Sequence, residues 1–135
     1  MKDLEKKIYQ HLKARHWHKL RPVDIAKSIM IEGAELLELF QWENLSLEDI
    51  KKDKVKVEEI KKELADVLIY AIEMAVLLEA DTEKIIRSKL VEVSKKYPAG
   101  LMKKRSNQQD PGSESVYWRI KKEARKKSSG SNGKI

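Results

Sequence analysis

The chain is 135 residues long, which is enough for one domain with a modest hydrophobic core. It contains no cysteine, so disulfide bonds and thiolate metal sites are excluded. It has no run of about 18 apolar residues and no apolar leader, and we therefore expect a cytoplasmic protein that does not enter a membrane. Only five glycines and three prolines interrupt an apolar pattern of helical period, which favours an all-α fold.

The net charge of +7 is concentrated near the C-terminus. Residues 1–98 hold 19 basic and 19 acidic residues, whereas residues 99–135 hold 10 basic and 3 acidic ones. We therefore expect a folded domain over 1–98 and a basic tail over 99–135. The domain gives no electrostatic reason to bind nucleic acid. The tail has a suitable charge, although such segments are also typical of solubilising, disordered ends.

The N-terminal half predicts two helices and a short turn. Residues 3–16 form an amphipathic helix. A second helix begins near Pro22, whose missing N–H suits the first turn, and runs to about Trp42. A polar connection follows over residues 43–54, with a short helical turn that starts at Ser46. The apolar face of the first helix comprises Leu4, Ile8 and Leu12.

The second half predicts two further helices and a mostly irregular tail. A third helix spans about 55–79, and Asp81 caps a fourth that runs from Thr82 to about Tyr97, where the YPAG sequence ends it. Within the tail we expect a short helix at 116–127 and disorder in the final SSGSNGKI. The fourth helix is expected to bury Ile85, Ile86, Leu90 and Val93.

Four helices of this kind predict a helix bundle. The second and third helices are apolar on more than one side, and one small chain cannot cover all of that surface. We therefore expect the bundle to be completed by homo-oligomerisation, as a homodimer or a homotetramer.

Two acidic pairs interrupt the apolar sequence of the second and third predicted helices. Glu32 and Glu35 lie in IMIEGAELLELFQW, and the second pair, Glu63 and Asp66, lies in EIKKELADVLIYAIEMA. The i, i+3 spacing puts both carboxylates of a pair on one helical face. Burying an unpaired carboxylate is very costly, so a cluster of both pairs requires a cation, and Mg²⁺ prefers such oxygen ligands. The alternative for each pair is a solvated helix face.

The same segments resemble a known family. EGAELLELFQW (Glu32 to Trp42), ELADVLIY (Glu63 to Tyr70) and KKYP (95–98) together resemble the MazG-type all-α nucleoside triphosphate pyrophosphohydrolases. Within that family the chain is most similar to the dCTP-pyrophosphatase-like branch, over about residues 4–98. The basic tail has no counterpart in the resemblance.

The resemblance implies a chemistry and a set of ligands. It implies Mg²⁺-dependent hydrolysis of (deoxy)nucleoside triphosphates to the monophosphate and pyrophosphate, a house-cleaning of the nucleotide pool, with Mn²⁺ as a substitute ion. Divalent ions suit this reaction because they neutralise charge that develops on the triphosphate. For the general base we favour Glu35 or Glu38. The implied metal ligands are Glu32, Glu35, Glu63 and Asp66.

The resemblance also implies a nucleotide pocket. In the family, a tyrosine at the place of Tyr70 lies near the sugar, and tryptophans matching Trp17 and Trp42 enclose the base. Lys89 and Lys96, seven residues apart on one helical face, could each hold a phosphate. Each of these side chains also has a structural interpretation, as a core tyrosine, packed tryptophans or solvated lysines.

The base and two other functions stay open. Val93 stands where the dCTP-type relatives carry an asparagine that hydrogen-bonds the base, and valine cannot do so. Phosphoribosyl-ATP pyrophosphohydrolysis is an alternative within the same superfamily, although the FQW sequence argues against it. The non-enzymatic alternative is a helical oligomer that binds nucleic acid or an acidic partner through its tail.

Overall fold

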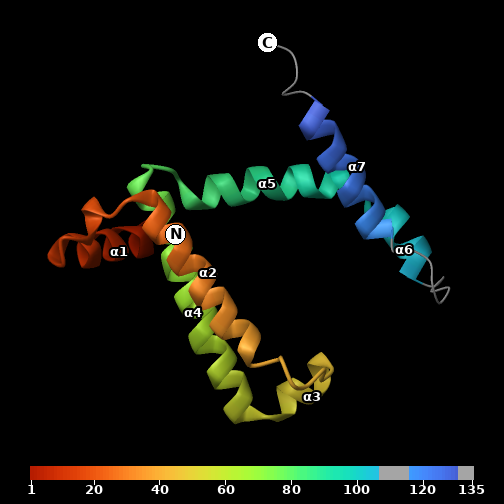
Figure 1. The fold of residues 1–135 in the computed structure, drawn as a ribbon, viewed down its shortest axis with the longest axis horizontal. Helices are drawn as coiled ribbons and strands as arrows, with labels where there is room; N and C mark the ends of the chain where they lie inside the picture. Colours follow the sequence, from red (N-terminus) through yellow and green to blue (C-terminus); the bar gives the residue numbers. More distant parts are fainter. Residues whose placement is uncertain (107–115, 131–135) are drawn as a thin grey trace. The chain divides into compact units, whose positions relative to one another are not determined.

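The computed structural model describes residues 1–106 and 116–130, and its regular secondary structure within these residues is helical throughout (Figure 1). This confirms the predicted all-α fold. The chain forms two compact units, Met1–Ile85 and Ile86–Ile135. The elements are α1 (Lys2–Ala14), a 3₁₀ turn η1 (Trp17–Lys19), α2 (Pro22–Glu38), α3 (Leu47–Lys52), α4 (Lys54–Leu77), α5 (Thr82–Lys96), α6 (Ala99–Ser106) and α7 (Val116–Gly130).

The first unit is built on the pair α2 and α4. These two helices lie side by side and run in opposite directions, and α1 and α3 pack against α4 (Figure 1). Ile8 and Leu12 of α1 are buried, as predicted, whereas Leu4 is exposed. The fully packed core is small, and its buried apolar residues are Ile8, Leu12, Ile25, Ile72 and Ala75.

Local capping explains where most of these helices begin and end. Ser46 and Asp53 accept hydrogen bonds from the backbone N–H groups three residues later, at the starts of α3 and α4. Asp81 does the same for Lys84 in α5, at 2.9 Å, which confirms its predicted capping role. At the end of α4, Glu79 takes a left-handed conformation (φ 54°), and the Ala80 N–H donates to the Ala75 carbonyl, as in a Schellman motif.

One predicted boundary was wrong, and one helix was missed. Helix α2 ends at Glu38 rather than near Trp42 because the chain tightens there: the Phe40 and Gln41 N–H groups donate to carbonyls three residues earlier. Helix α6 was missed because YPAG was interpreted only as a stop. Pro98 cannot continue a helix, but its carbonyl accepts from the Leu101 and Met102 N–H groups and so starts a new one.

The expected burial along α5 is wrong for the single chain. Ile85, Ile86, Leu90 and Val93 are between 39% and 62% exposed. The described residues after Thr82 contain no buried side chain, so the second unit by itself provides no core against which this face could pack.

The tail contains the helix α7 in the segment for which a helix over 116–127 is predicted. It continues to Gly130, three residues beyond the expected end. The Ser128 and Ser129 hydroxyls both donate to the Arg125 carbonyl, which satisfies that backbone group near the helix end. The rest of the predicted disordered segment, 131–135, lies outside the described residues.

Candidate metal centre

Three carboxylates meet on the α2–α4 pair. Glu32 extends from α2, while Glu63 and Asp66 extend from α4, one helical turn apart. One oxygen of each residue lies within 4.8 Å of the corresponding oxygens of the other two. Glu32 and Glu63 are half-buried and Asp66 is exposed, so the cluster lies at the edge of the helix pair and is open to solvent.

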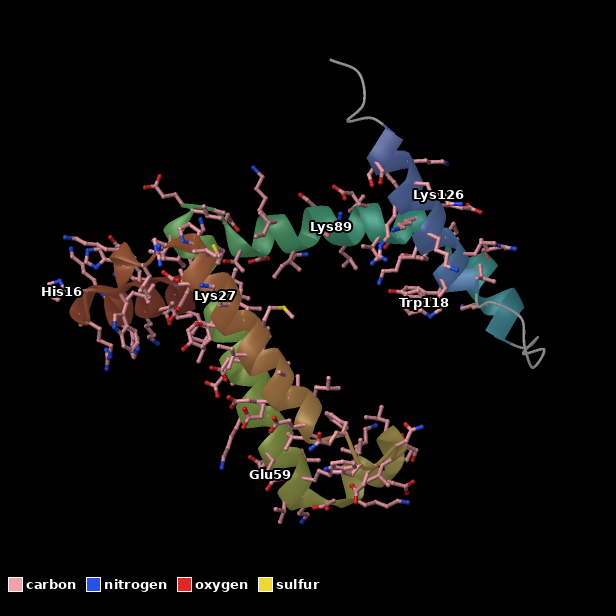
Figure 2. All side chains as sticks on the ribbon, viewed as in Figure 1. His16, Lys27, Glu59, Lys89, Trp118 and Lys126 are labelled. Atoms are coloured by element: carbon pink, nitrogen blue, oxygen red, sulfur yellow. The ribbon has the colours of Figure 1, made fainter. Side chains whose placement is uncertain are left out.

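The antiparallel packing of α2 and α4 brings these residues together. Lys27 lies near the start of α2 and Glu59 near the start of α4, so they are at opposite ends of the pair (Figure 2). Residues further along the two helices lie nearer the middle of the pair and therefore nearer to one another. Carboxylates at i, i+3 share one face of a helix, so Glu63 and Asp66 both lie on the face of α4 that meets Glu32 of α2. We call this contact between the two helices, with its three carboxylates, the α2–α4 seam.

The cluster is electrostatically unfavourable without a cation. Burial raises the pKa of Glu32 above its ordinary value of 4.5, and repulsion from Glu35, Asp66 and Glu63 raises it further. Among the described residues, none of the three clustered carboxylates has an ion pair with a lysine or arginine. Negative charge is therefore concentrated at one point with no protein partner to balance it.

A hard divalent cation fits this donor set. Carboxylate oxygens suit Mg²⁺, Mn²⁺ and Ca²⁺, and opposite ligands of one Mg²⁺ lie about 4.2 Å apart. Three ligands of one octahedral ion include at most one opposite pair, and adjacent ligands lie about 3 Å apart. The oxygens of Glu32, Glu63 and Asp66, within 4.8 Å of one another, therefore have to approach by up to about 2 Å when an ion binds. These three residues can therefore hold one such ion and leave further positions for water or a phosphate.

The other two acidic candidates lie along α2. Glu35 is one turn beyond Glu32 and exposed, and its charge contributes to the raised pKa of Glu32. It does not belong to the three-residue cluster. Glu38 is the last residue of α2 and is also exposed. Of the two candidate proton acceptors, Glu35 is therefore the one nearer to the cluster.

Tyr70 lies beside the cluster, one turn beyond Asp66 on α4. Burial raises the pKa of Tyr70 above its ordinary value of 10.0, and the charges of Glu32, Glu73 and Asp66 add to the increase. A hydrogen bond with the Ser28 side chain acts in the opposite direction. The sequence reasoning missed Ser28, although its position four residues before Glu32 places it on the same face of α2.

The two tryptophans lie beyond opposite ends of α2. Trp17 is in η1, with its ring in edge contact with His11 and 5.9 Å from the Arg15 guanidinium carbon. Trp42 is 87% exposed and lines an open cavity of about 340 Å³ in the turn after α2. The 17-residue helix between them is about 25 Å long. The single chain does not bring them together.

Lys89 and Lys96 belong to the second unit. Lys89 forms an ion pair with Glu92 at 2.6 Å, and the Lys96 ammonium lies 5.3 Å from the centre of the Tyr97 ring. Both lysines line one open cavity of about 360 Å³, which agrees with their predicted common face. All of these contacts lie within the second unit.

Glu73 is a buried acid outside the cluster, and the sequence reasoning missed it. It is only 3% exposed, and burial raises its pKa above the ordinary value of 4.5. It borders an apolar cavity of about 620 Å³ between α1 and α4. The available signal was its position in the apolar run VLIYAIEMAVL, where an acidic residue has no exposed face on which to lie.

Comparison with known proteins agrees with this picture. The model of the MazG-like family matches residues 27–110. The crystal structure of a pyrophosphatase from Archaeoglobus fulgidus is 34% identical in sequence, with a TM-score of 0.63; the match covers 73% of this chain and 92% of that one. No curated protein gives a significant sequence match.

The fold and the cluster define an all-α protein with three clustered carboxylates that can hold a divalent cation. The extent of the family match and the identity to the archaeal pyrophosphatase identify it further: the chain belongs to the MazG-like family, the MazG-type all-α pyrophosphohydrolases. Neither comparison assigns it to the dCTP-pyrophosphatase-like branch, which stays a prediction. Among the described residues, no helix is long and apolar enough to span a membrane.

Proposed function

We propose that this protein hydrolyses (deoxy)nucleoside triphosphates to the monophosphate and pyrophosphate with Mg²⁺, and that Mn²⁺ substitutes. The observation that carries the proposal is the cluster of Glu32, Glu63 and Asp66, which lies within the residues matched by the family model. The archaeal relative of known structure is described as a pyrophosphatase. We also propose that the protein acts in the cytoplasm on nucleotides of the cellular pool.

The proposed chemistry divides the work among named side chains. Glu32, Glu63 and Asp66 hold the cation, with Glu35 as a fourth ligand or as the base. When bound, the cation neutralises charge on the triphosphate. Cleavage breaks the α–β phosphoanhydride bond while a water oxygen bonds to phosphorus, and the proton of that water passes to Glu35. Glu38 is the alternative base, and Lys89 or Lys96 holds the β- or γ-phosphate, which leaves as pyrophosphate.

Tyr70 is proposed to lie against the sugar. Its ring extends from the face of α4 that carries Asp66, and its pKa responds to the charges of Glu32 and Asp66. A bulky ring at this place disfavours a 2′-hydroxyl, which favours deoxyribose. Trp17 and Trp42 are proposed to enclose the base. Since α2 separates them within one chain, this role requires that different subunits supply the two rings.

Homo-oligomerisation, as a dimer or a tetramer, is part of the proposal. The α2–α4 pair leaves large apolar side chains uncovered, which is unusual for a monomer of this size. They comprise Val23, Met30, Ile31, Leu37, Leu64, Leu68 and Ile69. Light scattering after size exclusion tests this: we expect a multiple of the monomer mass. Leu37→Glu should lower that mass, whereas Leu47→Glu, an equally exposed position on α3, should not.

The activity is tested by a substrate screen. The full chain is incubated with Mg²⁺ and each canonical or damaged (d)NTP, and with phosphoribosyl-ATP, and the products are separated by anion exchange. Monophosphate with pyrophosphate is the expected result for at least one (d)NTP. Diphosphate with orthophosphate, turnover of phosphoribosyl-ATP alone, or no turnover of any nucleotide would contradict the proposal.

A further inference from the structure

Helix α7 gathers positive charge on an exposed surface. Its 15 residues include six basic residues and one acidic residue, a net charge of +5. Lys126 extends outward from the ribbon (Figure 2). A helix of 15 residues spans about 22 Å. Lys121 is half-buried, and the other five basic residues are exposed. These five are Arg119, Lys122, Arg125, Lys126 and Lys127.

Aromatic rings lie beside these charges. Tyr117 of α7 stacks on Tyr97, with ring centres 5.2 Å apart and planes 22° apart. Trp118 meets Tyr117 edge-on at 5.5 Å and is 50% exposed. The Lys121 ammonium lies 5.3 Å from the centre of the Tyr117 ring and 5.0 Å from that of Trp118. The three rings, which we call the aromatic cluster, thus combine flat apolar surface with cationic charge.

This combination distinguishes among polyanions. A single strand of nucleic acid carries one phosphate per base, and its unpaired bases stack on exposed rings. A duplex hides its bases, and an acidic peptide has no flat ring beside each charge. An anionic membrane would require a free apolar face, but the apolar side chains of α7 at Val116, Ile120 and Ala124 are already half-buried.

We propose that α7 and Tyr97 form a binding surface for single-stranded nucleic acid. The exposed basic side chains contact successive phosphates, and a base stacks on Trp118 beside Lys121. Helix α7 lies beyond residues 27–110, the part matched by the family model, whereas Tyr97 lies within it, so the basic part of this surface is additional to the family match. It does not depend on the proposed hydrolysis.

The test uses the full chain and fluorescein-labelled 15-nucleotide dT and rU strands in fluorescence anisotropy titrations between 20 and 200 mM NaCl. We expect binding of at least one strand, with log affinity falling linearly against log salt concentration. Each neutralised phosphate contributes about −0.7 to that slope, so six contacts give about −4. Absence of binding at 20 mM NaCl would overturn the proposal.

Matched variants separate stacking from charge. Trp118→Ala should weaken binding by about 5- to 150-fold without changing the salt slope, and Trp118→Phe should retain most of the affinity. Replacing Lys122, Arg125 and Lys126 together by Gln should make the slope shallower by about 2. The control removes the same charge from α1 by replacing Lys2, Lys6 and Lys13 with Gln, and should leave the slope unchanged.

Three results would contradict the assignment. The α1 control could weaken binding as much as the α7 variant, which would indicate an effect of net charge alone. Trp118→Ala could leave the affinity unchanged. Finally, a 15-base-pair duplex, poly-glutamate or phosphatidylserine vesicles could bind as tightly as the single strand. Circular dichroism of each variant establishes that α7 and the remaining helices are retained.

Discussion

The α2–α4 seam and helix α7 both concentrate charge of one sign, but in different surroundings. On the seam, three carboxylates crowd within 4.8 Å and burial contributes to the raised pKa of Glu32. On α7, exposed cations are distributed along 15 residues beside aromatic rings. A compact, partly buried cluster matches a small hard cation, whereas an extended exposed one matches a polymer. Geometry, more than charge, indicates the kind of ligand.

The largest expected effect is the loss of hydrolysis when a clustered carboxylate of α4 is replaced, compared with another carboxylate of the same helix. Glu63→Gln and Asp66→Asn should each lower nucleotide hydrolysis by about 10³-fold or more, because each removes a metal ligand. Glu59→Gln removes the same charge one turn away from the cluster and should change the rate by less than about 2-fold. The rates are measured at saturating Mg²⁺ with circular dichroism as the folding control. Equal effects at all three positions would refute a specific metal site.

The next effect distinguishes the two candidate bases. Glu35→Gln should lower kcat by about 10²-fold, because a positioned base contributes that much. Glu38→Gln, at the exposed end of α2, should change kcat by less than about 2-fold. The reverse result would assign the base to Glu38.

A smaller effect, the increase in Tm when Mg²⁺ is added, tests whether the clustered carboxylates repel one another until a cation binds. Adding 10 mM Mg²⁺ at neutral pH should raise the Tm by about 5 °C, as expected for an ion that binds only the folded state with millimolar affinity. Glu32→Gln should reduce this increase, whereas Glu59→Gln should leave it intact. Differential scanning fluorimetry measures all three, and an equal increase in every protein would contradict the site.

The pH dependence of the metal-free chain has a defined sign. The pKa of Glu32 is raised from 4.5, so the folded state holds its proton to higher pH than the unfolded chain does. Stability should therefore fall as the pH rises from 4.5 through the raised value. In EDTA, Glu32→Gln should lessen this fall; the part due to Glu73, whose pKa is raised in the same direction, should persist. If stability fell with pH in Glu32→Gln as much as in the wild-type chain, the crowding of Glu32 by the other carboxylates would be contradicted.

The smallest expected effect is on hydrolysis by variants of α7. Trp118→Ala should change kcat and KM for the preferred nucleotide by less than about 2-fold, because Trp118, unlike Tyr97 and Tyr117, does not line the cavity of Lys89 and Lys96. A large change in KM would join the two regions functionally and contradict their independence.

The sequence predicted best where local patterns decide the outcome. Helical periodicity located the four long helices, and the i, i+3 spacing placed Glu63 beside Asp66. It predicted less where the outcome depends on partners distant in sequence. The exposed face of α5 has apolar periodicity but meets no core within its own unit, and the burial of Glu73 follows from the packing of α1 on α4. Periodicity identifies an apolar face without showing what covers it.

The most direct test of the central claim is Mn²⁺ binding to the nucleotide-free protein, followed by electron paramagnetic resonance of the free ion. We predict saturable binding by the wild-type chain and by Glu59→Gln. Asp66→Asn should weaken it by at least about 10-fold, because it removes one oxygen ligand. Unchanged binding in Asp66→Asn, or no binding to the wild-type chain, would contradict a metal site formed by Glu32, Glu63 and Asp66.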